Sequence, residues 1–177
     1  MEMRATLFSS AASMLFCACA IADTATDTMT IQATLVATCV VNTGNFRDAP
    51  SPALLNFGTI TAGRPTRADT NAAAAGSGAA SVICSTGVPW TLTADGGNHL
   101  NGTQRQMSDG VMMLPYSLYR DGGYAFPIGI NDPANPVAAG TGTSVVQLTP
   151  MYGIVTADTP IPSVGNYSDS VTLTINY

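Results

Sequence analysis

Two cysteines carry the clearest chemistry in this sequence of 177 residues. If residues 1–22 are removed on export, Cys39 and Cys84 are the cysteines that remain. An even pair in an exported protein is most simply one disulfide, closing a loop of about 45 residues. A shared metal site is the alternative, but it would need three or four ligands, and His99 is the only histidine. We therefore expect a Cys39–Cys84 disulfide and no metal.

No group of side chains predicts catalysis. Asp95 and Asp121 each precede two glycines, as turn residues do, and His99 lies in a polar stretch typical of an exposed loop. No serine lies in a nucleophile-elbow motif. Two aspartates could meet in the fold and act on a glycosidic bond, but nothing in the sequence selects a pair. We expect neither enzymatic activity nor a cofactor.

The composition predicts an all-β protein without a basic surface. There is no lysine, and Glu2 is the only glutamate, so good helix formers are scarce while Thr, Val, Gly and Asn are abundant. The net charge is −5, and the few arginines form no cluster in the sequence. This balance argues against nucleic acid or anionic lipid as a partner.

The first 22 residues have the layout of a secretory signal peptide. A charged start is followed by an apolar run from Ala11 to Ala22, with Ala20-Ile21-Ala22 as the cleavage site. The run is too short to span a bilayer as a helix, and a buried N-terminal helix is the alternative. We expect a mature chain of about 155 residues that starts at Asp23 and forms one exported domain without direct membrane insertion.

Alternating apolar residues and turn signals predict seven or eight short strands in a β-sandwich with Greek-key connections. The segments predicted as strands are 29–41, 53–60, 79–85, 89–94, 111–120, 124–128, 143–157 and 171–177. Residues 63–78 are predicted as a loop or an edge segment, and residues 131–142 as a loop. Trp90 is expected in the core, with a sugar-binding platform as the alternative.

The last predicted strand has an apolar face that needs a partner. Its apolar residues alternate with Thr172, Thr174 and Asn176, so they share one face, and they are Val171, Leu173, Ile175 and Tyr177. The sequence stops on this strand. Since an exposed strand edge favours association, we expect the strand to pair with another segment.

Several strings, in order, carry a resemblance that covers residues 31–177. They are ATCVV, LNFGTI, SVICS, WTLTADGG, PYSLYRDGG and YSDSVTLTINY. Together they resemble the spore coat protein U domain family, which includes subunits of archaic, Csu-type chaperone–usher pili. The alanine-rich residues 63–78 contain no such string.

The resemblance implies an incomplete immunoglobulin-like Greek-key sandwich with an N-terminal donor-strand extension. A missing strand would leave a hydrophobic groove, filled first by a periplasmic chaperone and then, at an outer-membrane usher, by another subunit's N-terminal segment. The implied extension is residues 23–35 and the domain residues 36–177. The donor side chains would be Met29, Ile31, Ala33 and Leu35, and the acceptor edge would be Val171, Leu173, Ile175 and Tyr177.

The implied function is that of a structural subunit of a surface pilus. Such a subunit would polymerise head-to-tail with other copies or related subunits, and the pilus would support adhesion and biofilm formation. Three alternatives remain open. The terminal strands could pair within one chain, the protein could fold alone as a secreted coat or matrix protein, or it could be a carbohydrate-binding adhesin that uses Trp90 with Tyr116 or Tyr119.

Overall fold

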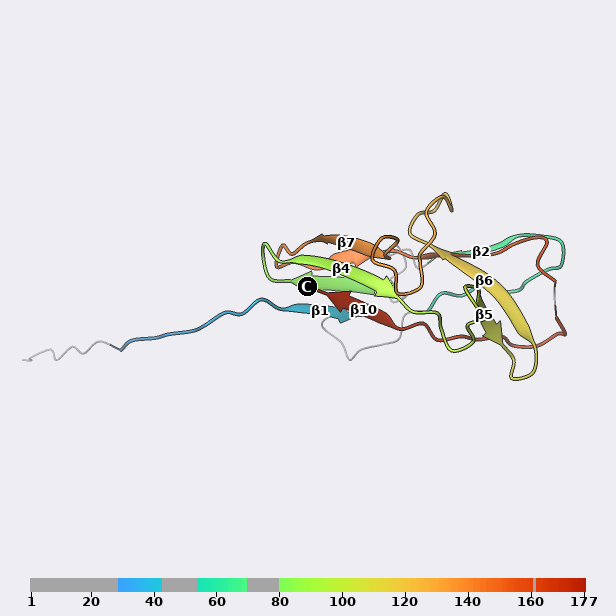
Figure 1. The fold of residues 1–177 in the computed structure, drawn as a ribbon, viewed down its shortest axis with the longest axis horizontal. Coiled ribbons are helices and arrows are strands. Elements are labelled where there is room, and N and C mark those ends of the chain that lie inside the picture. Colours follow the sequence, from blue (N-terminus) through green and yellow to red (C-terminus); the bar gives the residue numbers. More distant parts are fainter. Residues whose placement is uncertain (1–28, 43–53, 70–79, 161) are drawn as a thin grey trace, which may run out of the picture. The chain divides into compact units, whose positions relative to one another are not determined.

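The computed structural model describes residues 29–42, 54–69, 80–160 and 162–177 (Figure 1). The chain divides into two units, residues 1–34 and 35–177. The predicted signal peptide lies outside the described residues. In the first unit, residues 29–34 form no strand, and the side chains of Met29 and Ile31 are 82% and 81% exposed. The strand predicted over 29–41 is therefore too long, because strand β1 begins only at Cys39.

The second unit is built from antiparallel strands, and its described residues contain no helix. The strands are β1 (Cys39–Asn42), β2 (Thr66–Asp69), β3 (Ala80–Cys84), β4 (Pro89–Ala94), β5 (Arg105–Ser108), β6 (Met113–Tyr119), β7 (Ala138–Thr141), β8 (Gln147–Thr149), β9 (Tyr152–Val155) and β10 (Leu173–Asn176). The prediction of an all-β sandwich is confirmed.

The strands form three sheets, with the orders β1-β3-β8, β10-β4-β7 and β2-β9-β6-β5. Within this unit, β1, β4 and β10 lie toward one end and β5 and β6 toward the other (Figure 1). Strand β10 pairs with β4 in the register Leu173↔Ala94 and Ile175↔Leu92. Strands far apart in the chain are thus neighbours, as Greek-key connections require.

The core follows from the alternation of side chains along the strands. In β6, Leu114, Tyr116 and Leu118 are buried, while the residues between them are partly exposed. Strand β4 contributes Trp90 and Leu92 to the same core. Trp90 is only 5% exposed, which confirms its predicted core position.

Two further contacts hold strands and loops of this unit together. The predicted disulfide joins Cys39 at the start of β1 to Cys84 at the end of β3. Arg105 on β5 is only 5% exposed, and its guanidinium donates hydrogen bonds to the carbonyl oxygens of Asp95 and Ile128 at 2.9 Å, Gly129 at 3.0 Å and Ala94 at 3.3 Å. A buried cation is tolerated here because main-chain acceptors surround it.

Two predicted strands are wrong. Residues 54–60 are not in a strand, because they have no ladder partner among the described residues. Residues 124–128 form only an isolated bridge between Tyr119 and Pro127. The N–H groups of Ala125 and Phe126 donate to the carboxylate of Asp121 and so are unavailable for a ladder. Pro127 has no N–H to donate.

Other segments differ from prediction in extent. Strand β7 lies inside the loop predicted over 131–142, and β5 was not predicted. The single strand predicted over 143–157 is two strands, β8 and β9, on either side of Pro150. Strand β2 falls within residues 63–78 and is the outer strand of its sheet, in keeping with an edge segment.

Candidate assembly groove

An apolar groove of about 810 Å³ opens in the second unit. Its floor is formed by buried side chains of β5 and β6, namely Met107, Leu114, Tyr116 and Leu118. One side is formed by residues 54–60, and the other by residues 162–171 and Leu173 at the start of β10. Side chains from distant parts of the sequence thus meet around this groove.

Residues 54–60 alternate as a strand does, although they lack strand partners. Leu55 and Phe57 are partly buried and pack against the core, whereas Leu54 and Asn56 are exposed. The ring of Phe57 meets the ring of Tyr116 edge-on, with centroids 6.1 Å apart. Among the described residues, the main chain of 54–60 makes no hydrogen bond to other main-chain groups. The segment therefore has the side-chain pattern of a strand and an unpaired backbone.

The side chains of Leu55 and Phe57 pack closely onto the backbone of strand β9. A Cβ atom added at Gly153 would lie 2.6 Å from Cδ2 of Leu55 and 2.7 Å from Cζ of Phe57. Only a residue without a side chain lets these two side chains pack over β9. Gly153 therefore determines how closely Leu55 and Phe57, on this side of the groove, approach β9.

On the opposite side, β10 has one paired edge and one open edge. Thr172 faces β4, because its carbonyl oxygen accepts from the N–H of Asp95 at 3.0 Å and its N–H donates to the carboxylate of Asp95 at 2.9 Å. Main-chain groups alternate in direction along a strand, so those of Leu173 and Ile175 point toward the edge away from β4. No described strand pairs with that edge.

Asp95 is suited to hold this strand while charged. Partial burial disfavours its ionised form, but hydrogen bonds from the N–H groups of Gly97 and Thr172 outweigh that cost and lower the pKa of Asp95. Its predicted role as a turn residue is confirmed by the 2.9 Å bond from Gly97, and Asp121 has the same role toward Gly123.

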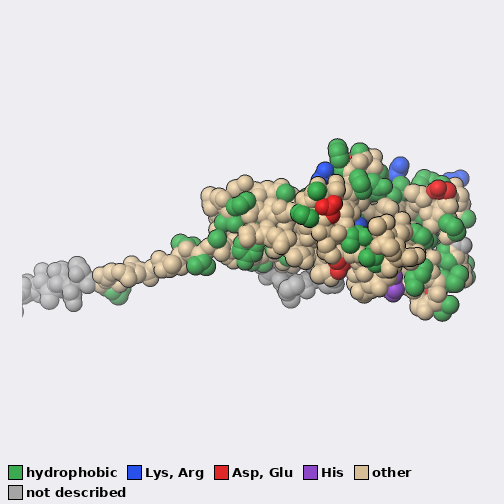
Figure 2. Space-filling model, viewed as in Figure 1, with side chains coloured by type: hydrophobic (Ala, Val, Ile, Leu, Met, Phe, Trp, Pro, Cys, Tyr) green, Lys and Arg blue, Asp and Glu red, His purple; other side chains and the backbone are tan. Residues whose placement is uncertain are grey.

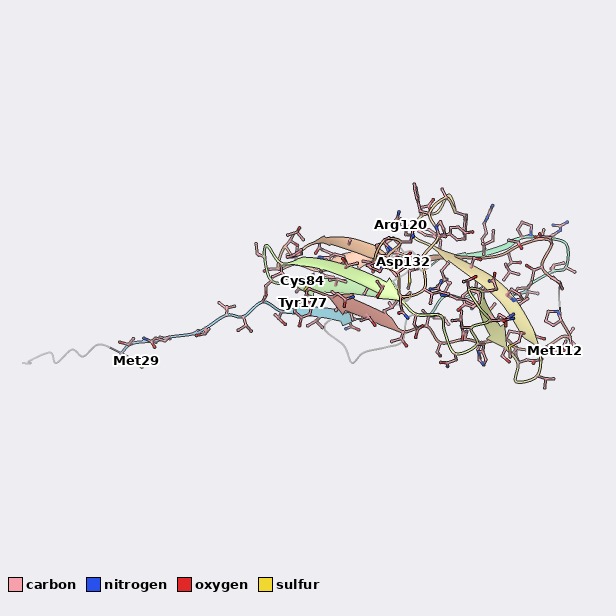
Figure 3. The ribbon with its side chains drawn as sticks, in the orientation of Figure 1. Met29, Cys84, Met112, Arg120, Asp132 and Tyr177 are labelled. Carbon is pink, nitrogen blue, oxygen red and sulfur yellow. A yellow bond between two sulfur atoms is a disulfide. The ribbon has the colours of Figure 1, made fainter. Side chains whose placement is uncertain are left out.

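The predicted acceptor residues divide into two groups. Val171 and Leu173 line the groove. Ile175 packs on the core farther along β10, and Tyr177 follows the strand and is 61% exposed. Tyr177 and Cys84 are at the same end of this unit, while Met112 is at the other (Figure 3). The predicted donor side chains Met29, Ile31 and Ala33 lie in the first unit, and Leu35, which is 94% exposed, begins the second.

A polar cluster fixes the chain just before β10. The side chain of Asp169 is only 3% exposed, and its oxygens accept from the hydroxyl of Tyr116 at 2.6 Å and the N–H of Asn98 at 2.9 Å. Nδ1 of His99 lies 3.2 Å from the same carboxylate. His99 is thus partly buried against Asp169, rather than a free loop residue as predicted.

Gly97 is required where this cluster meets the β4–β5 turn. Its φ angle is +76°, which favours glycine, and an added Cβ atom would collide with Oδ2 of Asp169. Burial raises the pKa of Tyr116, and the hydrogen bond to Asp169 raises it further. Both effects favour a neutral hydroxyl that donates a hydrogen bond to the Asp169 side chain.

Several chemical roles find no support in the described residues. Trp90 is only 5% exposed, so the predicted alternative of a sugar-binding site that uses Trp90 with Tyr116 or Tyr119 is wrong. The described part of the chain contains no group of three or more His, Cys, Asp or Glu side chains placed to hold a metal ion. Nor does it contain a helix long and apolar enough to cross a membrane.

Comparisons with known proteins agree with this architecture. A structural comparison finds a chain from the crystal structure of the CsuC–CsuE chaperone–tip adhesion subunit pre-assembly complex of archaic chaperone–usher Csu pili of Acinetobacter baumannii. The TM-score is 0.51 at 14% identity, and the match covers 81% of this chain and 41% of that chain. No curated protein sequence matches this chain. At this identity, the structural likeness concerns the fold.

The family is established by sequence. The profile of the Spore Coat Protein U domain matches residues 25–174, which is most of the 177-residue chain. The match includes the cysteine pair, residues 54–60 along the groove and the first two residues of β10. The chain belongs to the Spore Coat Protein U domain family.

Proposed function

We propose that this protein is a structural subunit of a surface pilus, assembled by the chaperone–usher pathway through donor-strand exchange. The observation that carries the proposal is the apolar groove of about 810 Å³ between two unpaired backbones, residues 54–60 and the open edge of β10. An extended apolar segment laid between them would find main-chain partners on both sides and pockets for alternate side chains.

The N-terminal segment has the pattern that such an occupant needs. Met29, Ile31, Ala33 and Leu35 alternate with polar residues, so an extended chain would direct all four to one face. We propose that residues 23–35 of one copy fill the groove of another, after removal of residues 1–22 on export. A contact of this kind is head-to-tail and does not close, so it builds a filament.

The proposed partners follow from the order of events. A periplasmic chaperone would occupy the groove of a new subunit, and an outer-membrane usher would be the place where another copy's donor segment replaces it. The product would lie at the cell surface, where a filament serves adhesion and biofilm formation. The structural neighbour comes from a pre-assembly complex of a chaperone and a pilus subunit, and this supports a chaperone as the first partner.

Paired substitutions test donation and acceptance separately. Ile31→Asp should block donation but leave chaperone binding intact, while Gln32→Asp, on the opposite face of an extended segment, should polymerise normally. Leu173→Asp should abolish chaperone capture and lower periplasmic yield. Thr174→Asp, at an exposed position of β10, is its matched control. The readouts are co-purification with the co-expressed chaperone and the ladder of polymers on gels of unboiled samples.

Three outcomes would contradict the proposal. A chain lacking residues 23–35 that polymerises as readily as the full chain would rule out the donor segment. Equal loss of chaperone binding in Ile31→Asp and Leu173→Asp would contradict the separate roles. Monomeric, two-state unfolding of the full chain expressed without a chaperone would favour a self-folding secreted coat or matrix protein.

A further inference from the structure

The outer face of the sheet β1-β3-β8 carries exposed apolar side chains. Val40 on β1 is about half exposed, and its register partner Ile83 on β3 is partly exposed and is not part of the buried core. Gln147 has a buried Oε1 atom, so its neighbours Val146 and Leu148 project from the other face, where each is about half exposed. We call Val40, Ile83, Val146 and Leu148 the base patch. None of the three strands contains a charged residue, and an exposed apolar patch of this kind is typical of an interaction surface.

A second apolar surface lies at the turn between β5 and β6. Val111 is 83% exposed, and Met112 and Met113 are each 43% exposed. We call these three residues the hairpin tip. The turn holds them in place, because the Asp109 carboxylate accepts hydrogen bonds from the N–H groups of Val111 at 2.9 Å and Met112 at 2.7 Å. Figure 3 labels Met112 at the end of this unit opposite Cys84, and Figure 2 shows hydrophobic side chains, in green, exposed near that end.

The hairpin tip adjoins one end of the groove. Leu114, on the floor of the groove, directly follows Met113. A Cβ atom added at Gly165, which lines the groove, would lie 3.0 Å from Oδ2 of Asp109 in the hairpin turn. Val164, next to Gly165, is fully exposed and adds another apolar side chain to this end. Whatever fills the groove up to this end therefore arrives beside the hairpin tip.

The proposed donor segment is joined to its own domain by a short link. Thr38 is already held by the domain, because its carbonyl oxygen accepts a hydrogen bond from the N–H of Ser85 at 2.9 Å. Only Val36 and Ala37 separate Thr38 from Leu35, the last proposed donor residue. Three Cα–Cα steps span at most about 11 Å. If Leu35 lies in the groove of another copy, as the proposed function on which this inference rests requires, the two domains are in close contact.

The end of the acceptor that the donor domain approaches follows from the head-to-tail order. Strand β10 runs from the groove at Leu173 toward Tyr177, which lies at the same end as Cys84 (Figure 3). The acceptor's own N-terminal segment leaves from that end too, because the disulfide holds Cys39 beside Cys84. In a filament, the next copy holds that segment and occupies the space there. The incoming donor domain must therefore lie at the opposite end, which carries the hairpin tip.

We propose that the hairpin tip of an acceptor copy packs against the base patch of the donor copy, as a second contact between consecutive subunits. The side chains of both surfaces are apolar and uncharged, so the contact buries apolar area without removing ions from water. Like the contact in the groove, it joins two different surfaces, so it repeats at every joint of the filament. It would hold consecutive domains at one angle, whereas domains without a substantial interface move relative to each other.

The test measures the bending of filaments formed by the exported chain. Val111→Asp and Leu148→Asp each place a charge in the contact and leave the donor and groove residues unchanged. Both variants should bind the chaperone and form the ladder of polymers, while the persistence length of their filaments in electron micrographs falls at least about twofold. Val40→Thr, a milder change on the base patch, should act in the same direction. Phe126→Asp, at an exposed residue of the loop after β6, is the control and should leave the persistence length unchanged.

A charge pair tests whether the two surfaces meet. Val111→Asp combined with Leu148→Lys places opposite charges on the hairpin tip and the base patch, and it should restore the persistence length of the wild type. A double variant as flexible as Val111→Asp alone would show that these surfaces do not meet.

The remaining outcomes separate this contact from the proposed function. A normal ladder of polymers with an unchanged persistence length in Val111→Asp, Leu148→Asp and Val40→Thr would overturn the contact and leave donor-strand exchange standing. Loss of chaperone co-purification in Val111→Asp, with unchanged thermal unfolding, would make the hairpin tip a chaperone contact instead. Failure of the wild type to polymerise would overturn both proposals.

Discussion

The hydroxyl group of Tyr116 donates a 2.6 Å hydrogen bond to Oδ2 of Asp169. Tyr116 belongs to the floor of the groove, and Asp169 lies just before the strand that forms its open edge. Main-chain hydrogen bonds between Ser108 and Ser168 fasten the same segment. The position of the edge is therefore set by contacts with β5 and β6 within the domain itself.

This bond makes the stability of the domain sensitive to alkaline pH. The folded-state pKa of Tyr116 is raised by burial and by Asp169, so the stabilisation is fully present below the unfolded pKa of about 10. It is lost as pH rises above that value toward the folded pKa. We expect the free energy of unfolding to fall above about pH 10, and to fall less steeply in Tyr116→Phe. Urea unfolding at a series of pH values above and below about 10 measures how the free energy of unfolding depends on pH in both proteins. The same pH dependence in the wild type and in Tyr116→Phe would contradict the role given to Tyr116.

The buried guanidinium of Arg105 should contribute through its forked shape. Arg105→Met leaves several buried carbonyl oxygens without donors and should lower the free energy of unfolding by about 3 kcal/mol. Arg105→Lys keeps the charge but cannot reach all the acceptors, so its free energy of unfolding should lie between those of Arg105→Met and the wild type. Denaturant unfolding of the three proteins measures these differences. A lysine variant as stable as the wild type would show that charge alone is sufficient.

Loss of the disulfide should destabilise the domain through the chain entropy of the unfolded state. The bridge spans a sequence separation of 45 residues, which corresponds to about 4 kcal/mol on the loop-entropy relation. The double variant Cys39→Ser with Cys84→Ser should therefore unfold at lower denaturant concentration and be unaffected by reductant. Reduced wild-type protein should unfold at nearly the same midpoint as that variant. A variant as stable as the oxidised wild type would refute this contribution.

Gly153 should control the side of the groove formed by residues 54–60. Gly153→Ala forces Leu55 and Phe57 away from β9 and should lower the free energy of unfolding by about 1–3 kcal/mol. Adding Leu55→Ala makes room for the new methyl group. The double variant should then lose less stability than the sum of the single variants. Strict additivity in denaturant unfolding would show that these residues do not meet.

The parts of the fold that sequence predicts are those that local pattern specifies. Strands β3, β4 and β6 alternate or carry apolar runs, and Asp95 and Asp121 occupy turns that their side chains cap. The cysteine pair was predicted because two cysteines in an exported chain have few other uses. Each of these signals lies within a few neighbouring residues, or, for the disulfide, in the number of cysteines.

The parts that sequence does not predict depend on distant neighbours. Strand β7 (AAGT) has no apolar alternation, and it pairs because β4 lies beside it and Trp90 packs over Gly140. Arg105 lies in a polar stretch typical of a surface, but carbonyl groups from two other segments surround it. Conversely, residues 54–60 have a strand's pattern without a partner in the described residues. Alternation in sequence shows only that one face of a segment is buried. A segment that forms one side of a groove has such a face without being a paired strand.

The place of the disulfide has a mechanical consequence. Cys39 is the first residue of β1, where the N-terminal segment joins the paired part of the domain. A pull on that segment would reach Cys39 and cross to Cys84 through covalent bonds. Once the hydrogen bond from the N–H of Ser85 to the carbonyl oxygen of Thr38 is broken, the disulfide would hold Cys39 in place without relying on the hydrogen bonds between β1 and β3. The disulfide is therefore a covalent anchor for the N-terminal segment, and its reduction would leave β1 held to β3 by strand hydrogen bonds, from which it could peel away.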